Sequence, residues 1–117
     1  MLEYPGATTE ESVRVKLDTY LLNPDHPDGK SKARWFAAAL GFNRNNMDKL
    51  AKQIVFKSLE AVPAVSTPFE QKFRQMISIV GTNGRQIDIA FVWIQNDDGV
   101  TRLVTSLPTK KQRKQYV

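Results

Sequence analysis

The chain has 117 residues, of which 41% are hydrophobic and 25% are charged, and these proportions are those of a globular protein with one domain. It contains no cysteine, which excludes a disulfide framework, a cysteine-based zinc site and a thiol nucleophile. The formal net charge of +5 favours polyanionic partners, and no apolar run approaches the roughly 20 residues of a membrane-spanning helix.

The N-terminal part of the chain predicts a short leader followed by a helix. Residues 1–7 have no periodic pattern and are expected to be a leader or linker without the features of a signal peptide. The domain is expected over 8–108, followed by a basic tail over 109–117. The first helix is predicted to begin at Thr8, because Thr8 and Glu11 have the spacing of a capping box. It is predicted to end before Pro24.

Two further helices are predicted downstream of this proline. The second runs from about Gly29 to Leu40, and Gly41 supplies the left-handed residue that commonly follows a helix. The third begins after Asn45, whose side chain is expected to cap it. Its apolar residues have helical spacing over Met47, Leu50, Ala51, Ile54, Val55 and Leu59.

Beyond the third helix the apolar period changes from 3.6 to 2, which predicts strands. Residues 61–70 carry two prolines and are expected to form a crossing loop, with room for a short edge strand. Asn83-Gly84 is typical of a two-residue type I′ hairpin turn, and Asp98-Gly99 predicts the next turn. Three strands are predicted over Phe73–Val80, Arg85–Gln95 and Val100–Leu107.

The predicted turns determine which side chains share a face of the sheet. The expected floor for the helices is Phe73, Ile77, Ile79, Ala90, Val92, Ile94, Leu103 and Leu107. The opposite face is expected to carry Arg74, Ser78, Ile87, Ile89, Phe91, Trp93, Arg102 and Ser106. That second face has the character of a binding platform, the alternative being a smaller apolar cluster under a loop. A three-residue second turn would swap the faces of the last strand. The predicted fold class is therefore α+β, with three N-terminal helices packed on an antiparallel sheet of three to four strands.

The candidate chemistry lies in the loop that holds the single histidine of the chain. His26 stands between Pro24 and Pro27, and Lys30 and Lys32 follow it. An imidazole accepts and donates protons near neutral pH, and lysines stabilise phosphate charge, so this set suits metal-independent RNA cleavage. The same residues also suit an ordinary connector between helices. A metal site built from Asp25, His26 and Asp28 is a weaker alternative, because all three lie in one loop. The sequence does not identify the second acid–base group that cleavage needs.

Two strings in the chain carry a resemblance to a known family. The first is Lys16-Leu17-x-x-Tyr20-Leu21-Leu22-Asn23-x-x-His26-Pro27-x-Gly29-x-x-Lys32-Ala33-x-x-Phe36-x-x-x-Leu40-Gly41-Phe42. The second is Gly81-x-Asn83-Gly84-Arg85 with Val92-Trp93-Ile94 and Arg102-Leu103-Val104-Thr105-x-x-Pro108. Together they resemble a bacterial domain at the C-termini of contact-dependent growth inhibition (CdiA-type) polymorphic toxins and of phage Mu F-like proteins.

The resemblance implies a small ribonuclease similar to the barnase/EndoU/colicin/RelE group, which cleaves RNA, often tRNA, without a metal or cofactor. It implies one part of a secreted or cell-surface toxin that acts in the cytoplasm of the target cell. The implied partners are RNA, a cognate immunity protein and, as a further possibility, a host translation factor. No membrane is implied for the folded domain. The alternatives are a non-enzymatic nucleic-acid-binding module and a metal-dependent DNase toxin.

The resemblance assigns catalytic roles to four positions. His26 is expected to be the general acid or base, Lys32 and Arg102 to stabilise phosphate charge, and Thr105 to position an oxygen. Side chains alternate along a strand, so Arg102 and Thr105 can serve one site only if a bulge re-aims one of them. The residues predicted to bind RNA are Lys30, Arg74, Arg85, Trp93, Lys110 and Lys111.

Overall fold

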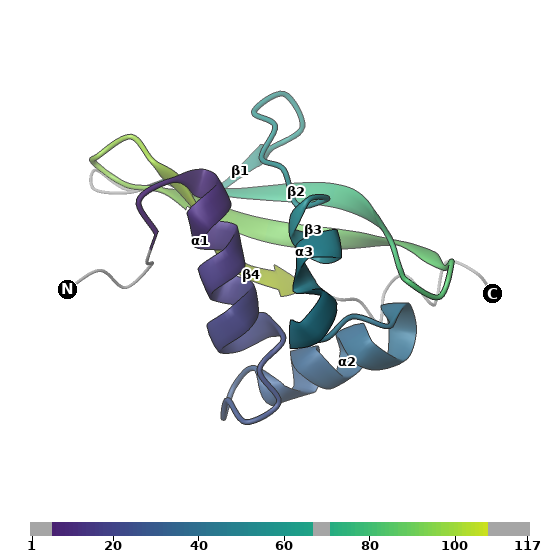
Figure 1. The fold of residues 1–117 in the computed structure, drawn as a ribbon. Coiled ribbons are helices and arrows are strands. Elements are labelled where there is room, and N and C mark those ends of the chain that lie inside the picture. Colours follow the sequence, from purple (N-terminus) through teal and green to yellow (C-terminus); the bar gives the residue numbers. More distant parts are fainter. Residues whose placement is uncertain (1–5, 67–70, 108–117) are drawn as a thin grey trace.

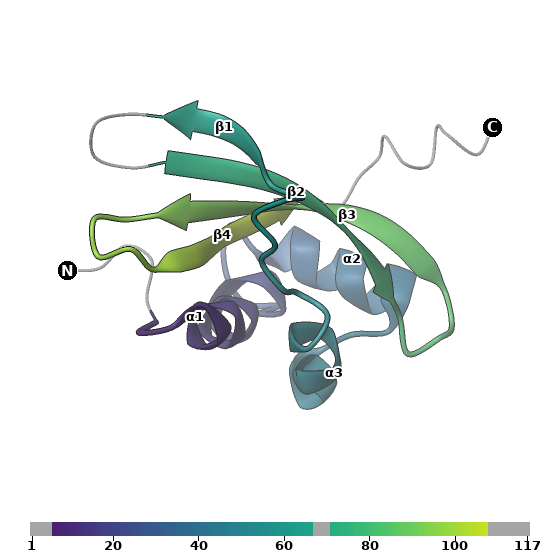
Figure 2. The same ribbon diagram turned by 90° about the horizontal axis from the view of Figure 1, so that it is seen from above.

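The helices come first along the chain and all lie on one side of an antiparallel sheet (Figure 1, Figure 2). The computed structural model describes residues 6–66 and 71–107. The helical elements are α1 (Thr9–Lys16), a π-helical turn (Leu17–Leu21), α2 (Lys30–Leu40), a 3₁₀ turn (Arg44–Asn46) and α3 (Met47–Ala51). The strands are β1 (Val62–Ser66), β2 (Gln71–Val80), β3 (Gln86–Gln95) and β4 (Thr101–Leu107), adjacent in that order. The predicted α+β class, with helices before strands, is confirmed. No helix among the described residues is long and apolar enough to cross a membrane.

The cap residues of the first two helices are confirmed, with the Thr8 half of the predicted capping box present. The Thr8 hydroxyl accepts a hydrogen bond from the Glu11 amide at 3.1 Å, which satisfies one of the free N–H groups of the first turn of α1. Helix α2 ends at Gly41, which has a φ of 76°. The Phe42 amide then donates to the Phe36 carbonyl at 3.1 Å, as in a Schellman motif, and Phe42 is buried.

The third helix is shorter than the apolar pattern predicts and begins from a different cap. Asn43, rather than Asn45, caps the 3₁₀ turn that leads into α3. Helix α3 ends at Ala51, and Leu59, predicted on its apolar stripe, is fully exposed in a turn. The segment after α3 is instead bound to β2 by two glutamine side chains, which replace helical hydrogen bonds with bonds to the sheet.

Gln53 and Gln75 are the two side chains that hold this segment. The Gln53 amide accepts from the Val80 N–H at 2.8 Å and donates to the Val80 carbonyl at 2.9 Å. Gln75 is buried, donates to the Val55 carbonyl and accepts from the Lys57 N–H. Both side chains imitate strand pairing, so the backbone after α3 lies against the sheet instead of continuing as a helix.

The β2–β3 turn has three residues rather than two. The Gly81 amide bonds to the Arg85 carbonyl at 2.7 Å, and Gly84 alone has a positive φ, of 84°, whereas a type I′ turn needs two such residues. The turn is held against the end of α2: Thr82 donates to the Gly41 carbonyl and Asn83 donates to the Ala39 carbonyl. These contacts with α2 favour the longer turn.

The extra turn residue shifts the pairing register by one and reverses the predicted facing of β3. Phe73 pairs with Trp93 and Ile77 pairs with Ile89, so the β3 residues that share the helix-facing side are Ile87, Ile89, Phe91 and Trp93. The residues Ala90, Val92 and Ile94, predicted as the floor, lie on the far face. The prediction for β2 is correct, and the prediction of a binding platform around Phe91 and Trp93 is wrong.

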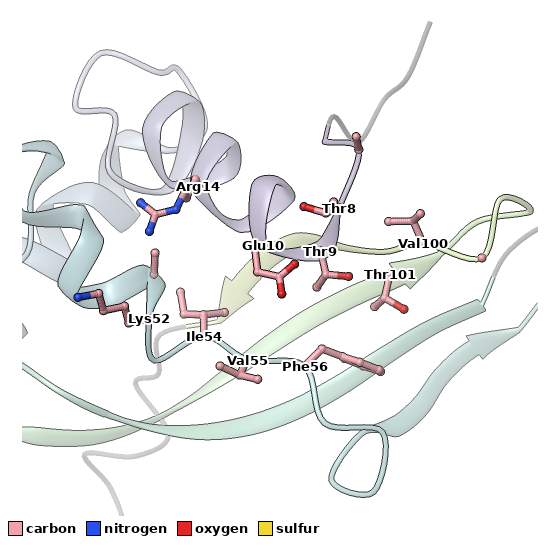
Figure 3. A pocket seen from close by; sticks show the side chains of 13 residues that line it. Thr8, Thr9, Glu10, Arg14, Lys52, Ile54, Val55, Phe56, Val100 and Thr101 are labelled. Atoms are coloured by element: carbon pink, nitrogen blue, oxygen red, sulfur yellow. The ribbon is translucent and has the colours of Figure 1, made fainter.

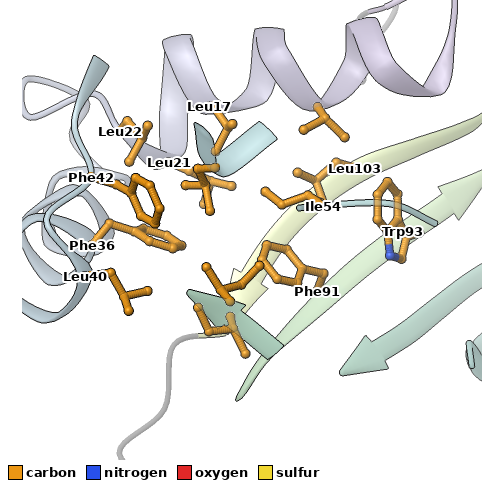
Figure 4. Close-up of a cluster of buried hydrophobic side chains, with 14 residues drawn as sticks. Leu17, Leu21, Leu22, Phe36, Leu40, Phe42, Ile54, Phe91, Trp93 and Leu103 are labelled. Atoms are coloured by element: carbon orange, nitrogen blue, oxygen red, sulfur yellow. The ribbon is translucent and has the colours of Figure 1, made fainter. Parts of the chain in front are cut away.

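The core fills the space between the helices and this face of the sheet (Figure 4). Trp93 and Phe91 are fully buried and belong to one cluster with side chains from α1, α2 and α3, and burying one such side chain contributes about 1.5–3 kcal/mol. The labelled members of the cluster are Leu17, Leu21, Leu22, Phe36, Leu40, Phe42, Ile54, Phe91, Trp93 and Leu103.

A β-bulge interrupts β4 beside the core. Val92 pairs with Thr105 and Trp93 pairs with Leu103, so Val104 is the extra residue. Thr105 and Arg102 therefore both lie on the far face of the sheet, as a re-aiming bulge predicts. The amide of Leu103 donates to the Ser12 hydroxyl of α1 at 2.8 Å, which fixes this part of the edge strand to the helical layer.

Candidate functional site

The loop before α2 holds the His26 ring in one orientation. Its Nδ1 atom accepts hydrogen bonds from the Asp28 amide at 2.9 Å and the Gly29 amide at 3.0 Å. The His26 carbonyl accepts from the Lys30 amide. His26 therefore binds backbone amides before and at the start of α2 through both its ring and its carbonyl. Because Nδ1 accepts from two donors, the neutral ring carries its proton on Nε2, which is the ring nitrogen left to donate a hydrogen bond to a ligand.

Lys32 and Thr105 converge on one backbone atom. The Lys32 ammonium donates to the Ser106 carbonyl at 2.7 Å, and the Thr105 hydroxyl donates to the same oxygen at 3.2 Å. Both views of the fold place the end of β4 beside α2 (Figure 1, Figure 2). We call Lys32, Thr105 and Ser106 the α2–β4 junction. Burial lowers the pKa of the Lys32 ammonium from its ordinary value of 10.5, because desolvation disfavours the charged form.

His26 lies close to this junction along the chain. Helix α2 begins at Lys30, so Lys32 is its third residue and His26 lies four residues before its start. Ser106 contributes to the junction through its carbonyl, and its own hydroxyl is buried without a hydrogen-bond partner among the described residues. Two of the four predicted catalytic residues, Lys32 and Thr105, are therefore brought together, and a third is on the loop that leads into the same helix.

Arg102 is at the other end of β4 and takes part in a different set of contacts. Its side chain is 3% exposed, and its Nη2 atom forms an ion pair with Asp98 at 2.8 Å. Its Nε atom donates to the Gly6 carbonyl at 2.7 Å, and Nη1 donates to Asn96 at 3.2 Å. The guanidinium is buried and hydrogen-bonded within the protein, so a catalytic role for it at the α2–β4 junction is not supported.

The residues predicted to bind RNA do not form one cluster. Lys30, Arg74 and Arg85 are exposed, but they belong to the start of α2, the far face of β2 and the β2–β3 turn. Trp93 is fully buried in the core, so it has no face on which a base could stack, and this prediction is corrected. Lys110 and Lys111 lie outside the described residues.

Sequence reasoning missed Tyr20 as part of the site. Its ring contacts His26 edge to face, with centroids 4.9 Å apart and an interplanar angle of 77°. The Lys16 ammonium lies 5.4 Å from the centroid of the same ring. Lys16 and Tyr20 both belong to the string that carries the family resemblance, and this membership is the signal that the sequence offers for them. The string alone gives neither residue a role.

A pocket of about 670 Å³ lies apart from these residues, between the start of α1 and the segment after α3 (Figure 3). Glu10 and Arg14 line it from α1, and Phe56 lines it from the segment after α3. None of the predicted site residues lines this pocket. Across residues 6–66 and 71–107, no three His, Asp or Glu side chains are grouped so that they could hold a metal ion.

The model of a family described as a domain of unknown function (DUF6883) matches residues 9–110. No curated protein and no solved structure matches the chain.

Proposed function

The chain belongs to the DUF6883 family, whose description states no function, and from the α2–β4 junction we propose that it is a metal-independent endoribonuclease. It acts as the toxic C-terminal domain of a contact-dependent growth inhibition protein, with RNA, most often tRNA, as its substrate. The observation that carries the proposal is the convergence of Lys32 and Thr105, 73 positions apart (105 − 32), on the Ser106 carbonyl. Both residues are also catalytic candidates on the family resemblance of the sequence.

The junction suits the chemistry of RNA cleavage. The 2′-hydroxyl attacks the adjacent phosphorus after losing its proton, and the 5′-oxygen leaves after gaining one. Proton transfer is assigned to His26, and acceptance of a proton at Nε2 requires Nδ1 to leave the Asp28 and Gly29 amides when RNA binds. The Lys32 ammonium stabilises the extra charge of the pentacoordinate phosphorane, since it is a partly desolvated cation held at a fixed position. The Thr105 hydroxyl turns from the Ser106 carbonyl to a phosphate oxygen when RNA binds.

The proposal assigns partners and a place of action that follow from the resemblance. A ribonuclease that kills its target cell must be inhibited in the cell that makes it, so a cognate immunity protein binds this domain. The net charge of +5 favours an acidic inhibitor, whose association slows as salt is added. The domain acts in the cytoplasm of the target cell.

The experiment that tests this function compares two substitutions of His26. His26→Asn keeps an acceptor for the Asp28 and Gly29 amides, as Asn23 already does for Asp25 in the same loop, but cannot titrate near neutral pH. His26→Ala removes both properties. RNA is incubated with each form in EDTA, and the single-turnover cleavage rate and the thermal midpoint are measured.

We expect both variants to lose about 10²–10⁴-fold in cleavage rate, because both lack the proton-transfer group. Only His26→Ala should also lose stability, by about 1 kcal/mol, because it leaves two amides of the turn unpaired. Cleavage by His26→Asn at the wild-type rate would remove His26 from the mechanism. RNA binding without cleavage by the wild type would instead favour a nucleic-acid-binding module, and cleavage only with Mg²⁺ would favour a metal-dependent nuclease.

A further inference from the structure

The pairing register aligns three side chains across the far face of the sheet, the side opposite the helices (Figure 2). Arg74 of β2 pairs with Val92 of β3, and Val92 pairs with Thr105 of β4. Residues that are directly opposite each other on neighbouring strands present their side chains on the same face. Arg74, Val92 and Thr105 therefore form a row across the sheet that ends at the α2–β4 junction. We call it the far-face row.

Arg74 is the exposed cation of the far-face row. Within the described chain its guanidinium takes part in no hydrogen bond or ion pair, unlike that of Arg102 on β4. Lys72, two positions along β2, adds a second positive charge to the same face. The carboxylate that the register places on this face of β2 and β3 is Asp88, about 13 Å along β3 from Val92. The surroundings of Arg74 therefore favour an anionic ligand.

Exposed apolar side chains flank Arg74 on the same face. Val62, which pairs with Arg74 from β1, is 62% exposed, and Met76, two positions along β2, is 50% exposed. Exposed apolar patches of this kind mark surfaces that bind a ligand or partner. Proteins that bind single-stranded nucleic acid combine positive charge for the phosphates with side chains against which unpaired bases pack. Arg74 with its apolar neighbours has this combination.

We propose that single-stranded RNA crosses the sheet along the far-face row, with Arg74 bound to a phosphate next to the scissile one. The inference rests on the proposed ribonuclease function, in which the Thr105 hydroxyl binds the scissile phosphate. Two strand spacings, about 10 Å, separate the backbones of Arg74 and Thr105, and Val92 lies between them under the ribose or base. The RNA is single-stranded here because bases contact apolar side chains only when they are unpaired and turned out of a stack.

The test compares Arg74→Ala and Arg74→Lys with the wild type in two assays. The first measures the affinity of a fluorescent 2′-O-methyl RNA oligonucleotide, single-stranded or annealed to its complement, over a series of salt concentrations. This probe lacks the attacking hydroxyl and is therefore not cleaved. The second measures single-turnover cleavage of total RNA in EDTA as the enzyme concentration is raised.

Arg34→Ala is the matched control. Arg34 is also an exposed arginine, but it belongs to α2 in the helical layer. It follows Lys32 by two positions, about 200° around the helix, so it lies on the side of α2 away from the α2–β4 junction. Its replacement removes the same charge without touching the far-face row. The thermal midpoint of each variant is measured to confirm that it folds like the wild type.

We expect Arg74→Ala to lose about tenfold in affinity for the single strand at low salt, and its salt slope to fall by about 0.7, the share of one phosphate contact. Cleavage of total RNA should fall by a similar factor at low enzyme concentration, and the loss should shrink as the enzyme approaches saturation, because Arg74 binds outside the reacting bonds. Arg74→Lys should keep most of the salt slope, since it keeps the charge. Arg34→Ala should change the affinity much less.

Equal losses for Arg74→Ala and Arg34→Ala would mean that overall charge holds the RNA, and would overturn the far-face row. An unchanged affinity of Arg74→Ala would also overturn it and would leave this face to a protein partner. Tighter binding of the duplex than of the single strand would overturn the single-stranded path. All three outcomes leave the ribonuclease function in place. RNA binding by the wild type without cleavage of total RNA would instead overturn that function, and with it the scissile phosphate in this inference.

Discussion

The guanidinium of Arg102 joins the β3–β4 turn to the segment before α1. It binds Asp98 and Asn96 in that turn and the carbonyl of Gly6 before α1. Its donors are used within the protein, and its side chain is almost completely buried. A buried arginine bonded in this way fixes the turn and the start of the domain, and its energetic contribution depends on the Asp98 carboxylate staying charged.

The pair predicts an acid-sensitive contribution to stability. The hydrogen bond from Arg102 lowers the pKa of the Asp98 carboxyl from its ordinary value of 3.8. Because the folded-state pKa is below the unfolded-state pKa, the stabilisation is present above about 3.8 and is lost as the pH falls through the lowered folded-state pKa. Asp98→Asn should therefore be less stable than the wild type at neutral pH, and the difference should disappear in strong acid.

Thermal unfolding of the wild type and Asp98→Asn between neutral pH and strong acid checks this expectation. Asp97→Asn is the control, because Asp97 is an exposed neighbour in the same turn. It should follow the wild type at every pH. A difference between Asp98→Asn and the wild type that does not change with pH would show that the carboxylate charge is not what stabilises the turn.

At the scale of elements, contacts between residues distant in sequence determine the length of α3 and the register of the β2–β3 hairpin, which local sequence signals do not predict. The caps of α1 and α2 were predictable, because each involves residues within one helical turn. The length of α3 and the hairpin register were not, because Gln53, Gln75 and Thr82 bond to backbone far away in the sequence. The single added turn residue is enough to exchange the two faces of β3, and it moved Trp93 from the predicted RNA surface to the core.

In the candidate site, too, the residue types could be predicted from the sequence, whereas the contacts between distant residues could not. His26, Lys32 and Thr105 could be chosen from their chemistry and from the family resemblance. The acceptor that unites Lys32 and Thr105 is a backbone carbonyl, which no side-chain pattern reveals. The catalytic role predicted for Arg102 finds no support at the junction, because its donors bond to Asp98, Asn96 and Gly6, and sequence alone does not show that network.

Two glycine substitutions test how much the contact between α2 and the turn contributes. Gly41 and Gly84 both have positive φ, so alanine at either position costs about 1–2 kcal/mol in backbone strain. At Gly84 a Cβ atom meets nothing within 4 Å, whereas at Gly41 it would lie 2.3 Å from the Thr82 hydroxyl, which bonds to the end of α2. Gly41→Ala should therefore destabilise the protein more than Gly84→Ala in chemical unfolding.

Gly84→Ala serves as the matched control, since it carries the same backbone penalty without the clash. Gly41→Ala combined with Thr82→Ala should recover part of the difference, because the clashing hydroxyl is gone. Equal losses for the two single substitutions would mean that the turn does not depend on its contact with α2.

At the scale of the whole molecule, the candidate site is assembled from the two ends of the described fold. Lys32 is in the second helix, and its acceptor is 74 positions later, on the last strand. His26 and Tyr20 belong to the helical layer, which leaves Thr105 and Ser106 to be delivered by β4. The site therefore exists only when the sheet is complete and the helices are packed on it.

The long sequence separation between the helical residues of the site and β4 has a consequence for the time course of folding. Pairings between residues this distant in sequence form late, because closing a long loop costs entropy before the contact repays it. A chain still emerging from a ribosome would have its first helices but not the proposed site. After dilution from denaturant, RNA cleavage should return together with the burial of Trp93, which pairs with Leu103 of β4, and never ahead of it. Stopped-flow fluorescence of a Trp35→Phe variant would follow the burial of Trp93, and samples taken in parallel would be assayed for RNA cleavage. Cleavage that recovers before Trp93 is buried would show that the helical layer is active without the last strand.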